Sequence, residues 1–239
     1  MYWYCIIAFI FLTGLCMWNE EECMKAIVFD MDGVLFDTEV LCMKAWVEVA
    51  KENKLPGMEE VFPQCIGLNA NDSRRIVMNA YGEDFDYARF REQTSAWFRK
   101  YIEEKGLPVK PGVKELLDWL KNSKYVVGLA SSTKGESVRS HLKLAGIEDS
   151  FRAVVTGDMV EHSKPLPDIY LRACAGLGAD TKEAYAIEDS PNGIRSAYRA
   201  GMKPLMVPDM IAPDEEMRRL SHKIFKDLHE VLAYLKEDC

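Results

Sequence analysis

The sequence lacks the clustered cysteines and histidines that bind zinc. Its seven cysteines form no Cys-x-x-Cys pair, and its four histidines form no pattern with them. Free thiols are typical of a reducing compartment, so we expect a cytoplasmic protein. An excess of positive charge is also lacking, because the formal net charge is −8. A surface of that sign repels phosphate backbones, and we expect no nucleic-acid partner.

Charged side chains are absent from residues 1–18. An apolar run of about 20 residues can span a bilayer. This run, however, has no basic residue before it and no small-residue cleavage site after it, and Glu20 to Glu22 follow. Three interpretations stay open for residues 1–23: a segment upstream of a translation start at Met24, a membrane anchor, or a degenerate signal. We expect contact with a membrane only if residues 1–18 provide it. We also expect the protein to be a monomer.

Apolar, β-rich runs alternate with helical patterns along most of the chain. Residues 25–30 predict a strand buried on both faces. Residues 38–105 hold helical patterns alone. Alternation of strands and helices in the rest favours a parallel sheet with helices on both faces. We therefore expect an α/β, Rossmann-like core at residues 24–37 and 106–239, with an inserted all-helical cap domain at 38–105. Further strands are predicted at 125–131, 151–156, 184–189 and 203–207.

Polar side chains follow the predicted strands at the points where they end. Ligands of parallel α/β sheets bind beyond the carboxyl ends of the strands, so we expect these side chains to meet at one edge. Several carboxylates in one place repel one another unless a cation joins them, and oxygen ligands alone favour Mg²⁺ over zinc. A lysine and hydroxyl groups beside a metal suit a phosphate group. The residues concerned are Asp30, Asp32, Ser131, Ser132, Lys164, Glu188 and Asp189.

The segment Asp30-Met31-Asp32-Gly33 is the sharpest of these features. Two acids spaced by two residues at a strand end point to one side, and Gly33 allows the chain to turn at once. One carboxylate can attack phosphorus while the other hands a proton to the leaving oxygen. Taken alone, such a segment is also explained as a polar strand end with helix-capping acids. Its combination with the other strand-end residues favours covalent phosphoryl transfer.

Four segments, in order, resemble the motifs of the haloacid dehalogenase-like superfamily. The helical insertion after the first of them is similar to the cap of its β-phosphoglucomutase-like branch. The resemblance implies that Asp30 is the nucleophile and forms an aspartyl-phosphate, and that Asp32 is the general acid and then the base for water. The matching segments are 30–39 (DMDGVLFDTE), 129–133 (LASST), 163–170 (SKPLPDIY) and 187–194 (IEDSPNGI).

The same resemblance implies the surroundings of the reacting groups. Ser131 and Lys164, with Ser132 beside them, would hold the transferring phosphate. Mg²⁺ would bind the carboxylates of Asp30 and Asp189 and the backbone carbonyl of Asp32. Glu188 would be a further ligand or a neighbour of one.

The first cap loop separates two possible activities. Sugar-phosphate mutases of the branch place an arginine there to hold a second phosphate, and this loop has none between Gly67 and Ser73. The lack of an arginine to hold a second phosphate favours hydrolysis over the mutase reaction. We therefore expect a Mg²⁺-dependent phosphatase acting on a small phosphorylated metabolite such as a sugar phosphate, with a β-phosphoglucomutase-type mutase as the alternative. We also expect the cap to contact the substrate through Thr38, Gly67, Asn69 and Asn71.

A phospho-receiver signalling module is a more distant alternative. It also combines an aspartate, Mg²⁺, a hydroxyl group and a lysine. In such a module, however, the phosphorylated aspartate ends a later strand, whereas Asp30 ends the first predicted strand and a helical insertion follows it.

Overall fold

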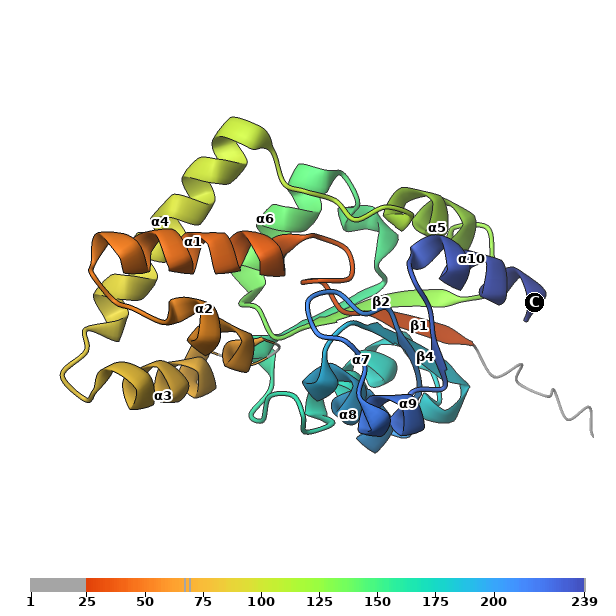
Figure 1. The fold of residues 1–239 in the computed structure, drawn as a ribbon. Coiled ribbons are helices and arrows are strands. Elements are labelled where there is room, and N and C mark those ends of the chain that lie inside the picture. The colour runs from red at the N-terminus through yellow and green to blue at the C-terminus, as the bar shows by residue number, and fades with distance from the viewer. Residues whose placement is uncertain (1–24, 67, 69, 239) are drawn as a thin grey trace, which may run out of the picture.

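Six parallel strands form one sheet in this computed structural model, which describes residues 25–66, 68 and 70–238 (Figure 1). The strand order is β3-β2-β1-β4-β5-β6. The chain thus winds from β1 to β3 on one side and then returns to place β4 on the other side of β1, the point where ligands of such sheets bind. The strands are β1 (Ala26–Phe29), β2 (Val126–Ser131), β3 (Ala153–Thr156), β4 (Ala184–Glu188), β5 (Lys203–Met206) and β6 (Lys223–Ile224).

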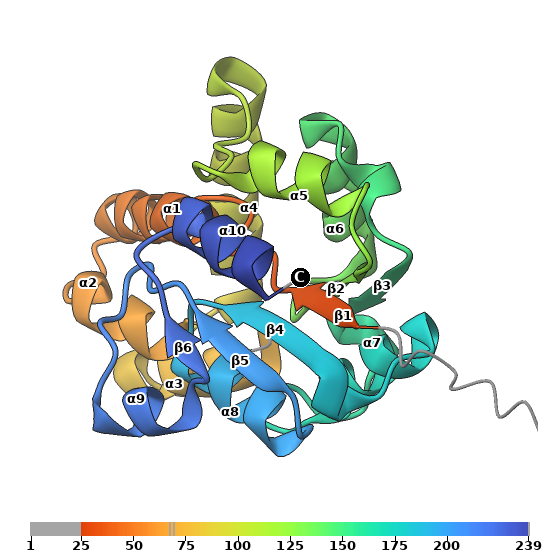
Figure 2. The ribbon, with the colours of Figure 1, turned by 90° about the vertical axis from the view of Figure 1, so that its right-hand side faces the viewer.

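Helices cover both faces of the sheet, because successive side chains of a strand point to opposite sides. Ile27 and Phe29 of β1 join an apolar cluster with α5, α6 and α10, whereas Ala26 and Val28 join a second cluster with α7 and α8. Figure 2 shows these two layers above and below the sheet. The predicted α/β fold is therefore confirmed. The helices are α5 (Val113–Leu120), α6 (Gly135–Ala145), α7 (Asp168–Leu177), α8 (Pro191–Arg199), α9 (Glu215–Leu220) and α10 (Leu228–Glu237).

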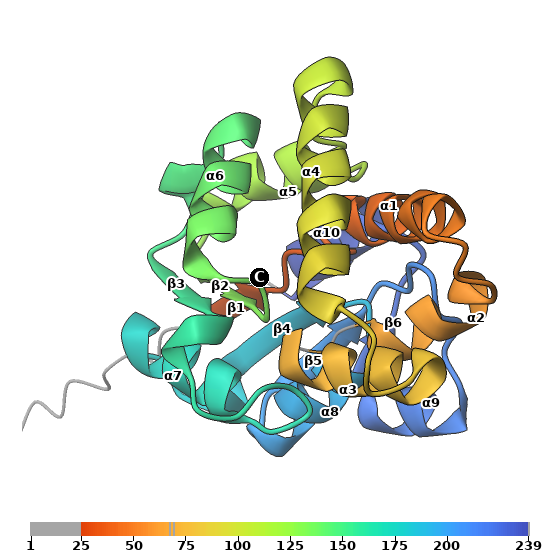
Figure 3. The same ribbon diagram turned by 90° about the vertical axis from the view of Figure 1, so that its left-hand side faces the viewer.

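The segment between β1 and α5 is helical and lies at the carboxyl end of the strands (Figures 1 and 3). Trp46 belongs to its apolar cluster, with the rings of Phe62 and Phe90 at 5.1 and 5.5 Å in edge-to-face contact. These helices form the expected cap, whose boundaries at 38 and 105 stay a prediction. They are α1 (Thr38–Glu52), α2 (Met58–Val61), α3 (Ala70–Tyr81) and α4 (Tyr87–Lys105).

The two chain segments that join cap and core lie side by side. Phe36 and Val109 form an antiparallel bridge. The amide of Asp37 donates to the carbonyl of Pro108 at 2.9 Å, and the amide of Lys110 donates to the carbonyl of Leu35 at the same distance. The cap is therefore attached through one hydrogen-bonded pair of segments.

Several element boundaries differ from the sequence prediction. The strand predicted at 151–156 begins at Ala153, and the one predicted at 184–189 ends at Glu188. Helix α8 begins at Pro191, where the Ser190 hydroxyl caps the first turn by accepting from the Gly193 amide at 3.1 Å. The short elements α2, α9 and β6 were not predicted, since a few residues carry no readable periodicity. None of the described helices is long and apolar enough to cross a membrane. The predicted extension 1–23 lies outside the described residues.

Candidate active site

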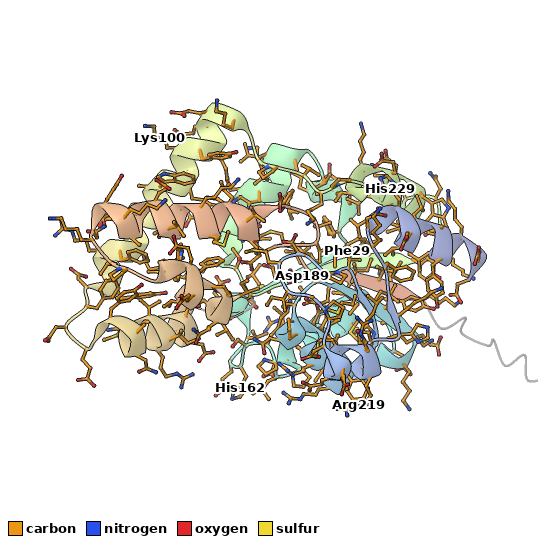
Figure 4. The ribbon with its side chains drawn as sticks, in the orientation of Figure 1. Phe29, Lys100, His162, Asp189, Arg219 and His229 are labelled. Atoms are coloured by element: carbon orange, nitrogen blue, oxygen red, sulfur yellow. The ribbon has the colours of Figure 1, made fainter. Side chains whose placement is uncertain are left out.

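Most of the predicted polar side chains lie together at the carboxyl edge of the sheet. Asp30 follows β1, Ser131 ends β2, and Glu188 and Asp189 end and follow β4. Lys164 reaches them from the loop between β3 and α7, and all five are more than nine-tenths buried. Figure 4 shows Asp189 in the middle of the molecule, near Phe29 at the end of β1. Residues that are distant in the chain thus form one polar cluster inside the protein.

Lys164 lies between two carboxylates. Its Nζ donates to Asp30 Oδ1 at 2.5 Å, to Glu188 Oε1 at 2.6 Å and to the carbonyl of Ala130 at 3.1 Å. Burial alone would lower the pKa of this lysine, but the charges of Asp30 and Glu188 outweigh it and raise the pKa. The ammonium group therefore stays charged next to the candidate nucleophile.

Glu188 is completely buried, and both of its carboxylate oxygens accept hydrogen bonds. Its Oε1 accepts from Tyr170 Oη at 2.7 Å as well as from Lys164. Its Oε2 accepts from the Asp189 amide at 3.1 Å and from the Ser190 amide and hydroxyl at 3.3 and 3.2 Å. Sequence reasoning missed Tyr170, which lies in a matched segment but on a helix whose inward face the sequence alone does not identify.

The carboxylates of Asp30, Glu188 and Asp189 offer oxygen atoms that all lie within 4.8 Å of one another. Burial raises the pKa of Asp30 to about 8, and the charges of Glu188 and Asp32 add to the rise against the opposing effect of Lys164. The pKa of Asp189 is raised well above its usual value by burial and then by Glu188 and Asp30. Crowded, buried oxygen ligands without nitrogen or sulfur fit Mg²⁺. The Asp32 carboxylate is not part of this set.

Asp32 is instead oriented by hydroxyl groups. Its Oδ1 accepts from Thr38 Oγ1 at 2.6 Å, and its Oδ2 accepts from Thr133 Oγ1 at 2.8 Å and from Ser131 Oγ at 3.4 Å. Thr38 was predicted to contact the substrate, and the structure places it beside Asp32. Thr133 follows the same strand as Ser131 and closes the matched segment 129–133, but it was not chosen among the predicted site residues.

The remaining predicted residues are placed differently. Ser132 lines the cavity beneath the cap, and its buried hydroxyl has no hydrogen-bond partner in the described part of the chain. Asn71 lines a separate hollow on α3 together with Arg74 and does not line that cavity. Gly67 and Asn69 lie outside the described residues, so their predicted contact with substrate stays a prediction.

Two glycines allow the acidic residues to approach so closely. A Cβ atom on Gly33 would lie 2.3 Å from Asp189 Oδ2, and Gly33 has a φ of +84°. A Cβ atom on Gly193 would lie 1.9 Å from Glu188 Cδ. Both positions exclude any side chain while Asp189 and Glu188 keep these positions. The turn at Gly33 was predicted from the sequence, but the close approach of Asp189 to Gly33 and of Glu188 to Gly193 was not.

A cavity of about 660 Å³ lies between this polar cluster and the cap. The core contributes Asp30, Asp32 and Lys164 to its walls, and the cap contributes side chains from α1 and α4. Its volume is within the range of small-molecule sites. Fold and cavity together are those of an α/β enzyme with a candidate active centre between a parallel sheet and a helical cap.

The particular family follows from comparison with known proteins. A family model for haloacid dehalogenase-like hydrolases matches residues 27–207, which is most of the chain. The chain therefore belongs to the haloacid dehalogenase-like hydrolase family, as its four motifs predicted.

Curated relatives agree with this assignment. The phosphorylated carbohydrates phosphatase of Thermotoga maritima is 31% identical, and the match covers 75% of this chain and 83% of the relative. The fructose-1-phosphate phosphatase of Escherichia coli K12 is 33% identical over 76% of this chain and 95% of its own. The β-phosphoglucomutase of Bacillus subtilis is 31% identical over 87% and 95%, respectively. These relatives confirm the predicted β-phosphoglucomutase-like branch and a phosphohydrolase as the enzyme class.

A solved structure shows the same fold. The β-phosphoglucomutase of Clostridium difficile superposes with a TM-score of 0.75 at 23% identity, covering 90% of this chain and 96% of that one. At that identity the likeness bears on the fold alone.

Proposed function

We propose that this enzyme is a Mg²⁺-dependent phosphatase that hydrolyses phosphate monoesters of small carbohydrates through an aspartyl-phosphate on Asp30. The observation that carries the proposal is the surroundings of Asp30. This carboxylate has a lysine on one oxygen, two further carboxylates near it, and a second, separately oriented acid two residues away. Covalent phosphoryl transfer needs this division between a nucleophile and a proton donor.

The first half of the reaction transfers the phosphoryl group to the enzyme. A carboxylate oxygen of Asp30 attacks phosphorus, and the bond from phosphorus to the ester oxygen breaks. Asp32 donates its proton to that leaving oxygen, so that an alcohol is released and an aspartyl-phosphate remains.

The second half regenerates the enzyme. The Asp32 carboxylate accepts a proton from water while the water oxygen attacks phosphorus, and the bond from phosphorus to the Asp30 oxygen breaks. Inorganic phosphate leaves, and both side chains regain their starting forms. Thr38 and Thr133 support both steps by fixing the position of Asp32.

The other polar residues bind and balance charge. Lys164 and Ser131 donate hydrogen bonds to phosphate oxygens, with Ser132 available beside them. Asp30, Glu188 and Asp189 would hold Mg²⁺, with the carbonyl of Asp32 as a predicted further ligand. When bound there, the ion offsets negative charge on the phosphate and on the buried carboxylates.

The substrate class follows from the relatives. Two of them are named as phosphatases of phosphorylated carbohydrates or fructose 1-phosphate. A relative named β-phosphoglucomutase makes isomerisation the second candidate. The absence of an arginine from the first cap loop favours hydrolysis.

Phosphate release from a panel of sugar phosphates, with and without Mg²⁺, tests the proposal. We expect Asp30→Asn to abolish release, because an amide does not attack phosphorus, and we expect chelation of Mg²⁺ to do the same in the parent. Asp118→Asn is the matched control, since Asp118 is an exposed acid on α5. Parallel assays with β-glucose 1-phosphate measure isomerisation.

Three outcomes would contradict the proposal. They are activity of more than a few per cent in Asp30→Asn, full activity without divalent ions, and isomerisation that exceeds phosphate release.

A further inference from the structure

One face of α4 turns toward the cavity and carries side chains that the proposed mechanism does not use. Ala88, Arg91, Ser95 and Arg99 all line the cavity, and they recur at spacings of three and four. This spacing places them along one stripe of the helix. Phe90, on an adjoining stripe, is buried in the cap cluster. Glu92 of α4 lines the cavity as well, so this side of the helix is polar and brings two arginines and one carboxylate toward the active centre.

Arg91 is a cation for which the described residues supply no paired anion. Its guanidinium lies over the Trp46 ring, 5.4 Å from the ring centre, which fixes its position in the cavity wall. Throughout the described part of the chain, no carboxylate forms an ion pair with it. By contrast, Arg195 pairs with Glu216 at 2.6 Å. A half-buried charge is stabilised when an anion reaches it.

Tyr87 lies one helical turn before Arg91 and carries another polar group to which the described residues offer no partner. Its side chain is 8% exposed and lines the cavity. Its hydroxyl is buried and has no hydrogen-bond partner among the described residues. Burial raises the pKa of Tyr87, and the charge of Arg91 opposes the rise, so the two groups are close enough to interact. Buried hydroxyl groups normally have a partner, and a bound ligand can supply one.

We propose that Arg91 and Tyr87 form a distal subsite for an anionic group, a carboxylate or a second phosphate, on the alcohol part of the substrate. The inference rests on the proposed function, in which the reacting phosphate lies at Asp30. The rest of the substrate then extends toward the cap, where a guanidinium and a hydroxyl offer donors to oxygen anions. Arg91 lies on α4 and not in the cap loop between Gly67 and Ser73, where the mutases of the branch place their arginine.

Matched substrate pairs test the subsite. 3-Phosphoglycerate and glycerol 3-phosphate differ by a carboxylate in place of a hydroxymethyl group, and fructose 1,6-bisphosphate and fructose 6-phosphate differ by one phosphate. For the parent enzyme, we expect a higher kcat/KM for the anionic member of at least one pair, and which pair responds distinguishes the two anions. Arg91→Met keeps an apolar stem over Trp46 but removes the charge. We expect it to lower the preference for the anionic member about 10- to 100-fold.

Further variants separate charge from structure. Arg91→Lys should restore part of the preference, and Tyr87→Phe should reduce it by a smaller factor. Arg89→Met is the matched control, because Arg89 lies on the same helix, is exposed and does not line the cavity. Circular dichroism and thermal melts establish that each variant is folded.

Binding is measured separately from turnover. Calorimetric titration of the same pairs into Asp30→Asn, with and without Arg91→Met, reports the subsite even where no phosphate is released. Absence of phosphate release from every pair, with charge-selective binding retained, would contradict the proposed function and leave the subsite standing. Equal loss of both members of a pair in Arg91→Met, or equal binding of both by Asp30→Asn, would overturn the subsite.

Discussion

Tyr170→Phe is the change that tests most directly how the buried carboxylates are stabilised. The substitution removes one hydroxyl group and keeps the ring. Tyr170 is fully buried, and that hydroxyl donates to Glu188 Oε1 at 2.7 Å. Lys164 Nζ lies 5.1 Å from the ring centre, so phenylalanine preserves this contact as well. The variant therefore isolates a single hydrogen bond to a buried charge.

The expected cost follows from the partners that remain. A hydrogen bond to a charged group contributes about 1.5–3 kcal/mol to stability. Glu188 Oε1 still accepts from Lys164, so the carboxylate is not left unpaired and we expect the lower end of that range. For a chain of this size, 1 kcal/mol corresponds to about 2–4 °C in Tm, and the melting temperature should fall by about 3–6 °C.

Calorimetry and reversible urea unfolding in the absence of Mg²⁺ measure this difference. Tyr198→Phe is the matched control, because Tyr198 is 53% exposed. It should shift the melting temperature by less than about 1 °C, since exposed substitutions usually change stability by under about 0.5 kcal/mol. An unchanged or higher melting temperature in Tyr170→Phe would refute the view that this hydrogen bond to the Glu188 side chain stabilises the fold.

Two further predictions concern the other acids. Asp32→Asn should lower kcat about 10²- to 10⁴-fold, because it removes proton transfer. Its Mg²⁺ affinity by calorimetry should be unchanged, and loss of affinity would contradict the assigned role. Asp238 accepts from Lys25 and Tyr125, each at 3.0 Å. Burial raises its pKa, but these hydrogen bonds outweigh it and lower the pKa below 3.8. Its contribution to stability is thus present above the unfolded pKa and lost as pH falls through the folded one. Unfolding free energy should fall less in Asp238→Asn than in the parent between about pH 5 and about pH 2.5, and parallel curves would contradict this.

The sheet could be predicted because its strands are buried on both faces. Ala26 to Phe29 form a continuous apolar run, and such runs separated by helical patterns indicate parallel strands. The strand order could not be derived from these runs, since it depends on which helix crosses which face. The two residues of β6 pair with β5 through backbone groups alone, so no side-chain pattern identifies them.

The acidic residues of the site could be predicted because they directly follow strands. Asp30 and Asp189 each follow a parallel strand, so they lie at the same edge of the sheet whichever helices cover its two faces. Residues that act through a neighbour were harder to find. Thr133 and Tyr170 each close a matched segment, but only the folded chain shows that they donate hydrogen bonds to Asp32 and Glu188. Arg91 was missed for the same reason, because the sequence does not show which face of α4 turns toward the cavity.

The bridged pair of segments at Phe36 and Val109 has a consequence for how substrate range can change. An insertion that enters and leaves at neighbouring points disturbs its host little, as in other tolerated domain insertions. Splicing a relative's helices between these two points requires only two junctions and leaves the strands of the sheet untouched. Chimaeras built in this way would exchange the selectivity of one enzyme for that of another while retaining the reacting acids.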